Sequence, residues 1–157
     1  MVTLRPAVAA DEALLLAWAN DPVARAAGFQ PEPISPDTHH RWFMQRLAEP
    51  ASSRIWIGLE NDKPIGVVRV EMAHDGALVV SISLDPAQRA QAKSRPLLEA
   101  GLSAARAAFR RARFRAWIRH GNRASVALFE GAGFEAPLNP PAGPPGTAPN
   151  AVVLERD

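Results

Sequence analysis

The chain of 157 residues contains neither cysteine nor tyrosine. Without cysteine it can form no disulfide, no thiolate metal site and no cysteine nucleophile. Without tyrosine it has no phenol to serve as a general acid. No apolar run approaches the roughly 20 residues that a membrane span needs, and the N-terminus lacks the apolar core of a secretory signal. We therefore expect a cytoplasmic protein that has no metal centre and no membrane partner.

The remaining composition is ordinary for a single globular domain spanning residues 1–157. Hydrophobic residues make up 47% and charged residues 22%, as in typical soluble domains, and the length allows a sizeable core. The net charge is only +2, but the positive charge is concentrated. There is no acidic residue between Glu99 and Glu130, and that interval is rich in arginine: Arg106, Arg110, Arg111, Arg113, Arg115, Arg119 and Arg123.

This arginine block indicates a phosphate-bearing partner, in nucleic acid or in a nucleotide cofactor. The alternative is a solvated helix end, where arginine favours the negative pole of the helix dipole. No aromatic side chains that could stack on bases alternate with the arginines on an exposed face. We therefore expect a phosphate-bearing small molecule rather than nucleic acid.

Period-two alternation, broken by turn residues, predicts strands along the whole chain. These strands span residues 2–5, 54–60, 65–72, 78–84, 114–119 and 151–155. Helical spacing and capping residues predict helices between them. One helix is capped by Asp11, one begins at Ser35, and two more span residues 94–111 and 122–130. The proline-rich stretch 137–150 should form a surface loop.

The segment that joins the fifth predicted strand to the last helix carries the most specific pattern. Its motif residues are Asn122, Ser125, Phe129, Gly133 and Phe134. Their spacing resembles the last conserved motif of the GCN5-related N-acetyltransferases, the GNAT family, in which the asparagine and its helix face the pantetheine arm and thioester of acetyl-coenzyme A. The resemblance implies an α/β (α+β) GNAT fold, with a mixed, mostly antiparallel sheet of about six to seven strands and about four helices. It also implies acetyl-coenzyme A as the acetyl donor.

A second stretch matches the family's pyrophosphate loop, which lies between the fourth strand and the following helix. A helix N-terminus suits phosphate because its backbone N–H groups are unpaired and its dipole end is positive. The matching residues are Arg89, Ala90, Gln91, Ala92, Lys93 and Ser94. Arg89 fits the pattern, but Ala92 replaces a glycine. An alanine with positive φ costs about 1 kcal/mol or more relative to glycine, and the cost is tolerable if the loop adopts ordinary helical angles, so we expect coenzyme A binding to be intact.

The N-terminal half carries a further resemblance. It rests on Trp18, Asn20, Pro22, Arg25, Ile34, Ser35, His39, Trp42 and Phe43. The segment is similar to that of acetyltransferases acting on nucleotide-linked 4-amino-sugars, the pseudaminic acid pathway type. This resemblance implies acetyl transfer to the primary amine of a small molecule, with such a sugar as the expected acceptor. Enzymes that acetylate protein N-termini share part of the pattern and are an alternative. Neither pattern decides between a monomer and a homodimer.

The family resemblance also implies direct attack of a neutral amine on the thioester, which requires a base. The candidate bases are Glu71, His39 and His40. Glu71 shares a strand face with Arg69, so a surface ion pair is the competing interpretation. A backbone N–H near Leu84, where the sheet of this family splays, should bind the developing oxyanion.

In this family a tyrosine often protonates the leaving thiolate, and Phe129 stands at or near that position here. Thiols titrate near about 8.5, so a thiolate is a fair leaving group and turnover does not require the phenol. Ser125 lies on the same helix face and could position a water molecule instead. The altered loop and the missing phenol leave a catalytically impaired GNAT-fold binding protein as an alternative.

Overall fold

The structure is a computed structural model that describes residues 1–110, 113–144 and 151–157. Its centre is a six-stranded sheet whose strands lie side by side in chain order. The strands are β1 (Thr3–Pro6), β2 (Ser53–Glu60), β3 (Lys63–Met72), β4 (Leu78–Leu84), β5 (Phe114–Arg119) and β6 (Ala151–Arg156). Neighbouring strands pair antiparallel except β4 and β5, which are parallel. The prediction of a mixed, mostly antiparallel sheet is therefore confirmed.

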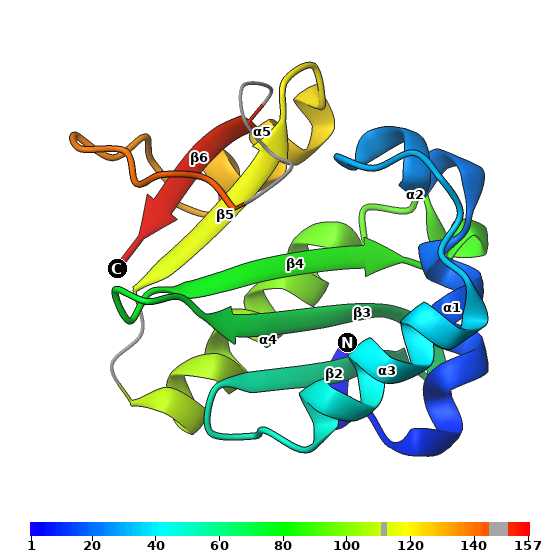
Figure 1. The fold of residues 1–157 in the computed structure, drawn as a ribbon. Coiled ribbons are helices and arrows are strands. Elements are labelled where there is room, and N and C mark those ends of the chain that lie inside the picture. Colours follow the sequence, from blue (N-terminus) through cyan, green and yellow to red (C-terminus); the bar gives the residue numbers. More distant parts are fainter. Residues whose placement is uncertain (111–112, 145–150) are drawn as a thin grey trace.

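Helices cover both faces of this sheet (Figure 1). One face carries α1 (Glu12–Ala19) and α3 (Pro36–Leu47), joined through the short helix α2 (Pro22–Ala27), and the other carries α4 (Ser94–Phe109) and α5 (Arg123–Gly131). Single turns of 3-10 helix span Ala9–Asp11 and Pro86–Gln88. Within the described residues, no helix is long and apolar enough to cross a membrane.

Two helix starts differ from the sequence prediction. Asp11 precedes α1 but does not cap it, because its carboxylate accepts hydrogen bonds from the Arg5 guanidinium and the Val8 N–H, each at 2.8 Å. The separate helix α2 was not predicted. Asp21 caps it by accepting a hydrogen bond from the Ala24 N–H at 3.1 Å, so the residues that end α1 also start the next helix.

Two predicted segments extend beyond the residues that the structure describes. The helix predicted over 94–111 ends at Phe109, because Arg110 adopts a φ of 59°, and Arg111 lies outside the described residues. The predicted loop 137–150 is described only as far as residue 144. The Ser35 cap is confirmed, since its hydroxyl accepts a hydrogen bond from the Thr38 N–H at 3.2 Å.

The start of α4 is fixed on the sheet by a notch between two glycines. Gly58 and Gly66 pair across β2 and β3, and the buried side chain of Leu97 fits over both. A Cβ atom on Gly58 would lie 2.4 Å from Leu97 Cδ1, and one on Gly66 would lie 2.7 Å from Leu97 Cδ2. Real side-chain atoms do not approach this closely, so glycine at these positions seats the first turn of α4 and the loop before it.

The sheet splits between β4 and β5. The register pairs these strands only through the first two residues of each, and β5 then turns away from β4 together with β6 (Figure 1). The N–H of Asp85 bonds to the carbonyl of Ile65 on β3 at 2.8 Å. Alternation along β4 therefore directs the N–H groups of Ile82 and Leu84 toward the gap.

An ion-pair cluster closes the other end of this split. Arg115 of β5 is buried and donates hydrogen bonds to Glu155 Oε2 at 2.6 Å and to Asp75 Oδ2 at 2.5 Å. Asp75 belongs to the turn between β3 and β4, and Glu155 belongs to β6. The cluster therefore ties three parts of the sheet together where β4 and β5 still pair.

We expect Asp75 to make stability depend on acid pH. Its hydrogen bonds with Arg115 lower the pKa of Asp75 to about 2, while an unfolded aspartate titrates near about 3.9. As pH falls from about 4 to about 2, the unfolded state binds a proton first, so the contribution of Asp75 to the free energy of unfolding is lost over that interval. Urea unfolding of the wild type and of Asp75→Asn measures it. The difference between the two should shrink over this pH range, and a constant difference would contradict the account.

Candidate active site

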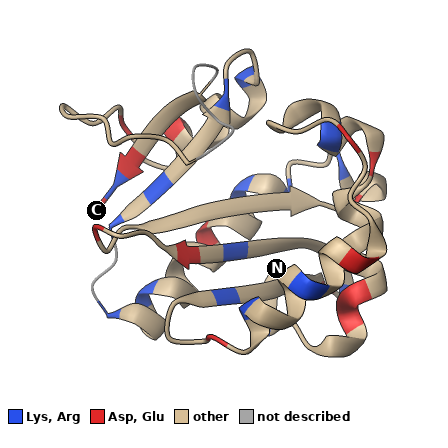
Figure 2. Ribbon diagram, in the orientation of Figure 1, with Lys and Arg blue, Asp and Glu red and all other residues tan. Residues whose placement is uncertain are grey.

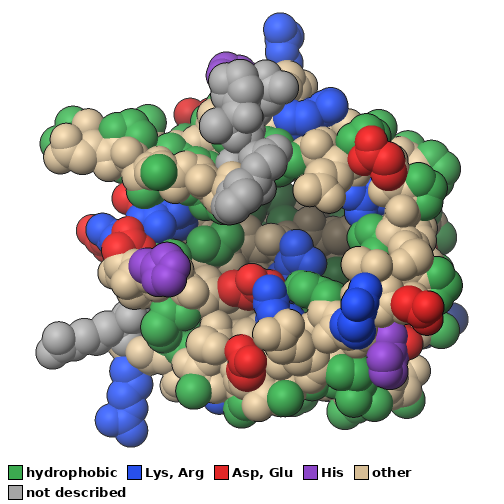
Figure 3. All heavy atoms as spheres, in the orientation of Figure 1, with side chains coloured by type: hydrophobic (Ala, Val, Ile, Leu, Met, Phe, Trp, Pro, Cys, Tyr) green, Lys and Arg blue, Asp and Glu red, His purple; other side chains and the backbone are tan. Residues whose placement is uncertain are grey.

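The split between β4 and β5 opens into a cavity of about 730 Å3. Its walls come from both faces of the sheet. Arg69 pairs with Ser81 in the register, so these side chains and Ser83 share the face that carries α1 and α3. Ile82 and Leu84 point to the opposite face and pack against the core beneath α4. Two ligands that approach from opposite faces can therefore meet in this cavity. Figure 3 shows a hollow near the centre of the α1–α3 face.

The half of the cavity beside α4 and α5 brings together most of the residues expected to bind the cofactor: Leu84, Arg89, Ser94, Asn122, Ser125 and Phe129. Phe129 is buried and packs edge-on against Phe134, with 5.0 Å between ring centroids. Ser125 faces the cavity from the first turn of α5. We call this region the donor half.

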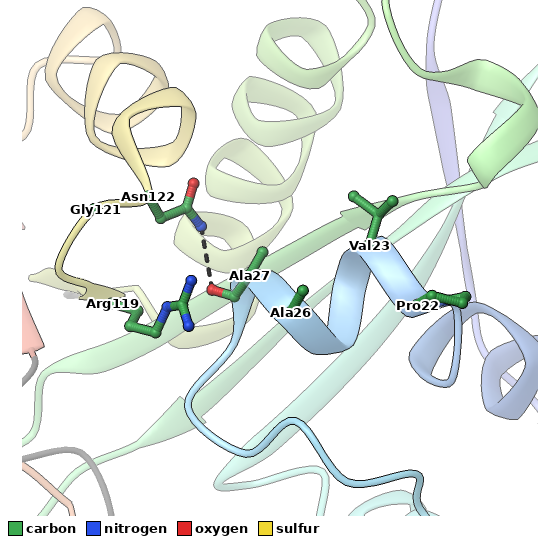
Figure 4. A pocket seen from close by; sticks show the side chains of 7 residues that line it. All are labelled: Pro22, Val23, Ala26, Ala27, Arg119, Gly121 and Asn122. Atoms are coloured by element: carbon green, nitrogen blue, oxygen red, sulfur yellow. Dashed lines mark hydrogen bonds between the residues drawn. The ribbon is translucent and has the colours of Figure 1, made fainter.

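Asn122 links the donor half to α2. Its side-chain oxygen accepts a hydrogen bond from the Ser125 N–H at 3.2 Å and so caps α5. Its amide nitrogen donates to the carbonyl of Ala27 at 3.4 Å, as the dashed line in Figure 4 marks. Beside this contact lies a second cavity of about 430 Å3, whose lining also includes Arg119. Asn122 therefore has a structural role in addition to the cofactor contact that the resemblance implies.

The loop before α4 does not adopt ordinary helical angles throughout. Ala90 and Ala92 adopt φ values of 61° and 55°, in the left-handed region that costs an alanine about 1–2 kcal/mol, so the loop does not avoid this cost. Left-handed residues turn neighbouring backbone N–H groups toward one side, and such concave backbone segments bind anions. The loop has therefore kept the backbone shape that glycine would favour, although it has alanine in its place.

The charged side chains of this loop are already paired within the protein. Arg89 donates a hydrogen bond to Asp21 Oδ2 at 2.6 Å, and Lys93 Nζ lies 2.8 Å from Glu60 Oε1. Gln91 donates to the carbonyl of Ala87 at 3.2 Å. Arg89 lines the cavity, whereas Lys93 does not. An anion at this loop would therefore meet side chains that already have partners within the protein.

The other half of the cavity, which we call the acceptor half, contains His39 of α3. The ring is buried, with a 4% exposed fraction, and its Nδ1 has no hydrogen-bond partner among the described residues. It stacks on Phe43 at 5.9 Å and lies 5.6 Å from Trp42, measured between ring centroids. Burial lowers the pKa of His39, although the charge of Glu12 acts in the opposite direction. His39 is therefore neutral at pH 7 and can accept a proton.

The structure does not bring the other candidate bases into the cavity. Glu71 accepts a hydrogen bond from Arg46 Nε at 3.0 Å and does not line the cavity. The ion pair that we weighed for Glu71 therefore exists, but its hydrogen-bonded partner is Arg46 of α3 rather than Arg69. His40 Nδ1 lies 2.5 Å from a carboxylate oxygen of Glu12, also outside the cavity lining.

Several cavity residues were not predicted as site residues from the sequence. They are Arg69, Ser81, Ser83, Trp117 and Arg119. Strand alternation was the available signal, because it places Arg69 and both serines on one face. The arginine block also divides: Arg115 is buried in ion pairs, whereas the Nε atom of Arg119 is buried without a hydrogen-bond partner in the described part of the chain. Among the described residues, no three acidic or histidine side chains lie together in a way that could hold a metal ion.

This chain resembles one known family and several solved structures. Residues 1–135 match the family model of the acetyltransferase (GNAT) domain. No curated protein sequence matches the chain significantly. Among similar solved structures is a spermidine N-acetyltransferase from Vibrio cholerae in complex with coenzyme A and spermine. It is 17% identical, with a TM-score of 0.81, over 99% of this chain and 94% of that one.

Other similar structures bear names that indicate different acceptors. An aminoglycoside acetyltransferase in complex with coenzyme A is 17% identical, with a TM-score of 0.82, over 99% of this chain and 94% of that one. A ribosomal-protein-alanine N-acetyltransferase from Brucella melitensis is 22% identical, with a TM-score of 0.77, over 98% of each chain. These likenesses show the fold, and the family model spans most of the sequence. The chain belongs to the GNAT acetyltransferase family.

Proposed function

We propose that this protein is an N-acetyltransferase that uses acetyl-coenzyme A to acetylate the primary amine of a small molecule. The observation that carries this proposal is one cavity whose donor half and acceptor half meet in the split between β4 and β5. The loop with left-handed Ala90 and Ala92 fits a pyrophosphate. Bound acetyl-coenzyme A would supply the acetyl group as an activated thioester.

The residues of the chain have separate tasks in this scheme. His39 lines the cavity from α3, and its imidazole ring takes a proton from the acceptor amine, since burial keeps the ring neutral at pH 7. The N–H of Leu84, which faces the split, donates a hydrogen bond to the carbonyl oxygen on which negative charge develops. The Ser125 hydroxyl holds a water molecule beside the leaving sulfur. Phe129 excludes bulk water there, and no phenol takes part.

We propose a nucleotide-linked amino-sugar as the acceptor. The support is the resemblance of the N-terminal segment, which builds the acceptor half: Trp18, Arg25, Ile34, His39 and Trp42 line the cavity. Asn20 holds the chain that follows α2, because its side chain exchanges hydrogen bonds with the N–H and carbonyl of Ile34 at 2.7 and 2.8 Å. A protein N-terminus is the second candidate, favoured by the same segment of sequence.

Two measurements test the proposal, first the binding of acetyl-coenzyme A and then the transfer of the acetyl group. At 100 times the dissociation constant, the ligand should stabilise the protein by about 2.7 kcal/mol, which raises the melting temperature measurably. Transfer is then followed by the release of coenzyme A thiol. The absence of cysteine means that a thiol reagent reports this product without background from the protein. Binding without transfer to sugar nucleotides or to peptides would favour the catalytically impaired alternative.

A further inference from the structure

The cavity lining carries charge of one sign in the described part of the chain. Among the described residues that line it, none is Asp or Glu, and the charged ones are arginines: Arg25, Arg69, Arg89 and Arg119. Figure 2 shows that Lys and Arg also occur on the strands of the sheet, and Figure 3 shows several of them around the hollow of the α1–α3 face. A cavity with low-dielectric walls and one sign of charge concentrates ligands of the opposite sign.

Arg69 has fewer partners than Arg25, the other arginine of the acceptor half. Arg25 Nε donates to the carbonyl of Gln30 at 3.1 Å, and Arg89 of the donor half is bound to Asp21. No hydrogen bond or ion pair joins the Arg69 guanidinium to a described residue; it lies 5.0 Å from the centroid of the Trp42 ring. Its donors therefore face the cavity uncommitted, at the centre of β3.

Arg69 keeps its positive charge. The residue is exposed and lines the cavity; desolvation by neighbouring atoms lowers the pKa of Arg69, but a guanidinium remains protonated. Glu71 acts in the opposite direction, and the positive charges of Arg46 and Arg25 lower it further. Glu71 is the nearby carboxylate, and it is hydrogen-bonded to Arg46. Arg25 and Arg69 therefore line the acceptor half, and no carboxylate belongs to the described part of this lining.

We infer that Arg69 is the specificity-determining residue of the acceptor half: it binds a phosphate group on the acceptor and disfavours polycationic amines. Phosphate fits better than carboxylate because each of the two linked phosphates of a nucleotide-linked sugar carries a negative charge, so that together they match more than one arginine. Arginine also offers paired donors in the geometry that phosphate oxygens accept. The inference deepens the proposed function and rests on it, since it concerns the same acceptor half.

The test measures binding of UDP, uridine and spermine by calorimetry, each in the presence of saturating coenzyme A so that the donor half is filled. UDP should bind, whereas uridine and spermine should bind at least roughly 10-fold more weakly. Arg69→Met should weaken UDP binding roughly 10-fold to 100-fold, as expected for loss of a hydrogen bond to a charged group. Arg69→Lys should recover part of this loss, because it keeps the charge without the paired donors.

Arg41→Met is the matched control. Arg41 is an exposed arginine of α3, next to Trp42 in sequence but outside the cavity lining, so UDP binding should not change. Equal binding of UDP and uridine, tighter binding of spermine, or unchanged UDP binding by Arg69→Met would each overturn the inference. Coenzyme A binding is measured separately in every variant. If the proposed function fails, the wild type should not bind coenzyme A; if only the inference about Arg69 fails, coenzyme A binding should remain.

Discussion

Replacing His39 with glutamine should lower kcat by at least ~100-fold, because general-base catalysis contributes about 10²- to 10⁴-fold. Glutamine has a similar size and can keep the contacts with Phe43 and Trp42, but it cannot accept a proton at pH 7. Binding of acetyl-coenzyme A should be unchanged, since the ring lies in the acceptor half. Steady-state release of coenzyme A thiol with an amine acceptor measures kcat for both proteins.

The matched control for this prediction is the neighbouring residue. His40 is exposed, paired with Glu12 and outside the cavity lining, so His40→Gln should retain kcat within about 2-fold. If His39→Gln also retained kcat, or if both variants lost it equally, His39 would not be the base.

The pH dependence of His39→Gln gives an independent check. Burial lowers the pKa of His39 below the ordinary value of 6.5, so the acid limb of the wild-type kcat/KM profile should lie below pH 6.5 and disappear in His39→Gln. The lowered pKa of His39 should also make the free energy of unfolding depend on pH. Below pH 6.5 the unfolded state binds a proton that the native state resists, so wild-type stability should fall with decreasing pH more steeply than that of the variant. Identical slopes for the two proteins would contradict a desolvated His39.

The second large effect concerns the loop before α4. Ala92→Val should raise the dissociation constant of acetyl-coenzyme A by about 10-fold or more, because a β-branched residue is a steric outlier at the φ of 55° that Ala92 adopts. The loop would have to leave the conformation that turns its N–H groups toward an anion. Ala92→Gly should bind at least as tightly as the wild type, since glycine takes positive φ without cost.

Calorimetry with acetyl-coenzyme A compares these two variants directly, and circular dichroism confirms that both are folded. Equal affinity of the valine and glycine variants would show that the backbone conformation at Ala92 does not matter for binding. The pyrophosphate would then have to lie elsewhere.

Sequence patterns predicted the strands well because each strand repeats its signal over several residues. Short segments whose residues are compatible with two structures were harder to predict. Asp21 and Pro22 are turn residues that typically follow the end of a helix, but here they cap and start α2. The left-handed angles of Ala90 and Ala92 could not be predicted, because alanine by itself disfavours them and the seating of α4 on the sheet is a tertiary constraint.

The site was predictable where residues lie close in sequence and less so where distant elements meet. The motif around Asn122 and Ser125 does line the cavity. Alternation correctly placed Glu71 and Arg69 on one face, yet it could not show that Arg46 of α3 reaches Glu71 or that Trp42 lies against Arg69. Those contacts depend on how α3 crosses the sheet, which no local pattern encodes.

The most direct test of the central claim is amine-dependent acetyl transfer measured by two products in one reaction. Purified protein, acetyl-coenzyme A and a nucleotide-linked amino-sugar should release coenzyme A thiol and form the N-acetylated sugar in equal amounts, with His40→Gln active and His39→Gln strongly impaired. Mass spectrometry of the sugar and a thiol reagent measure the two products. Acetyl-coenzyme A binding with no acetylated product from sugars, peptides or polyamines would contradict the claim that donor and acceptor react in this cavity.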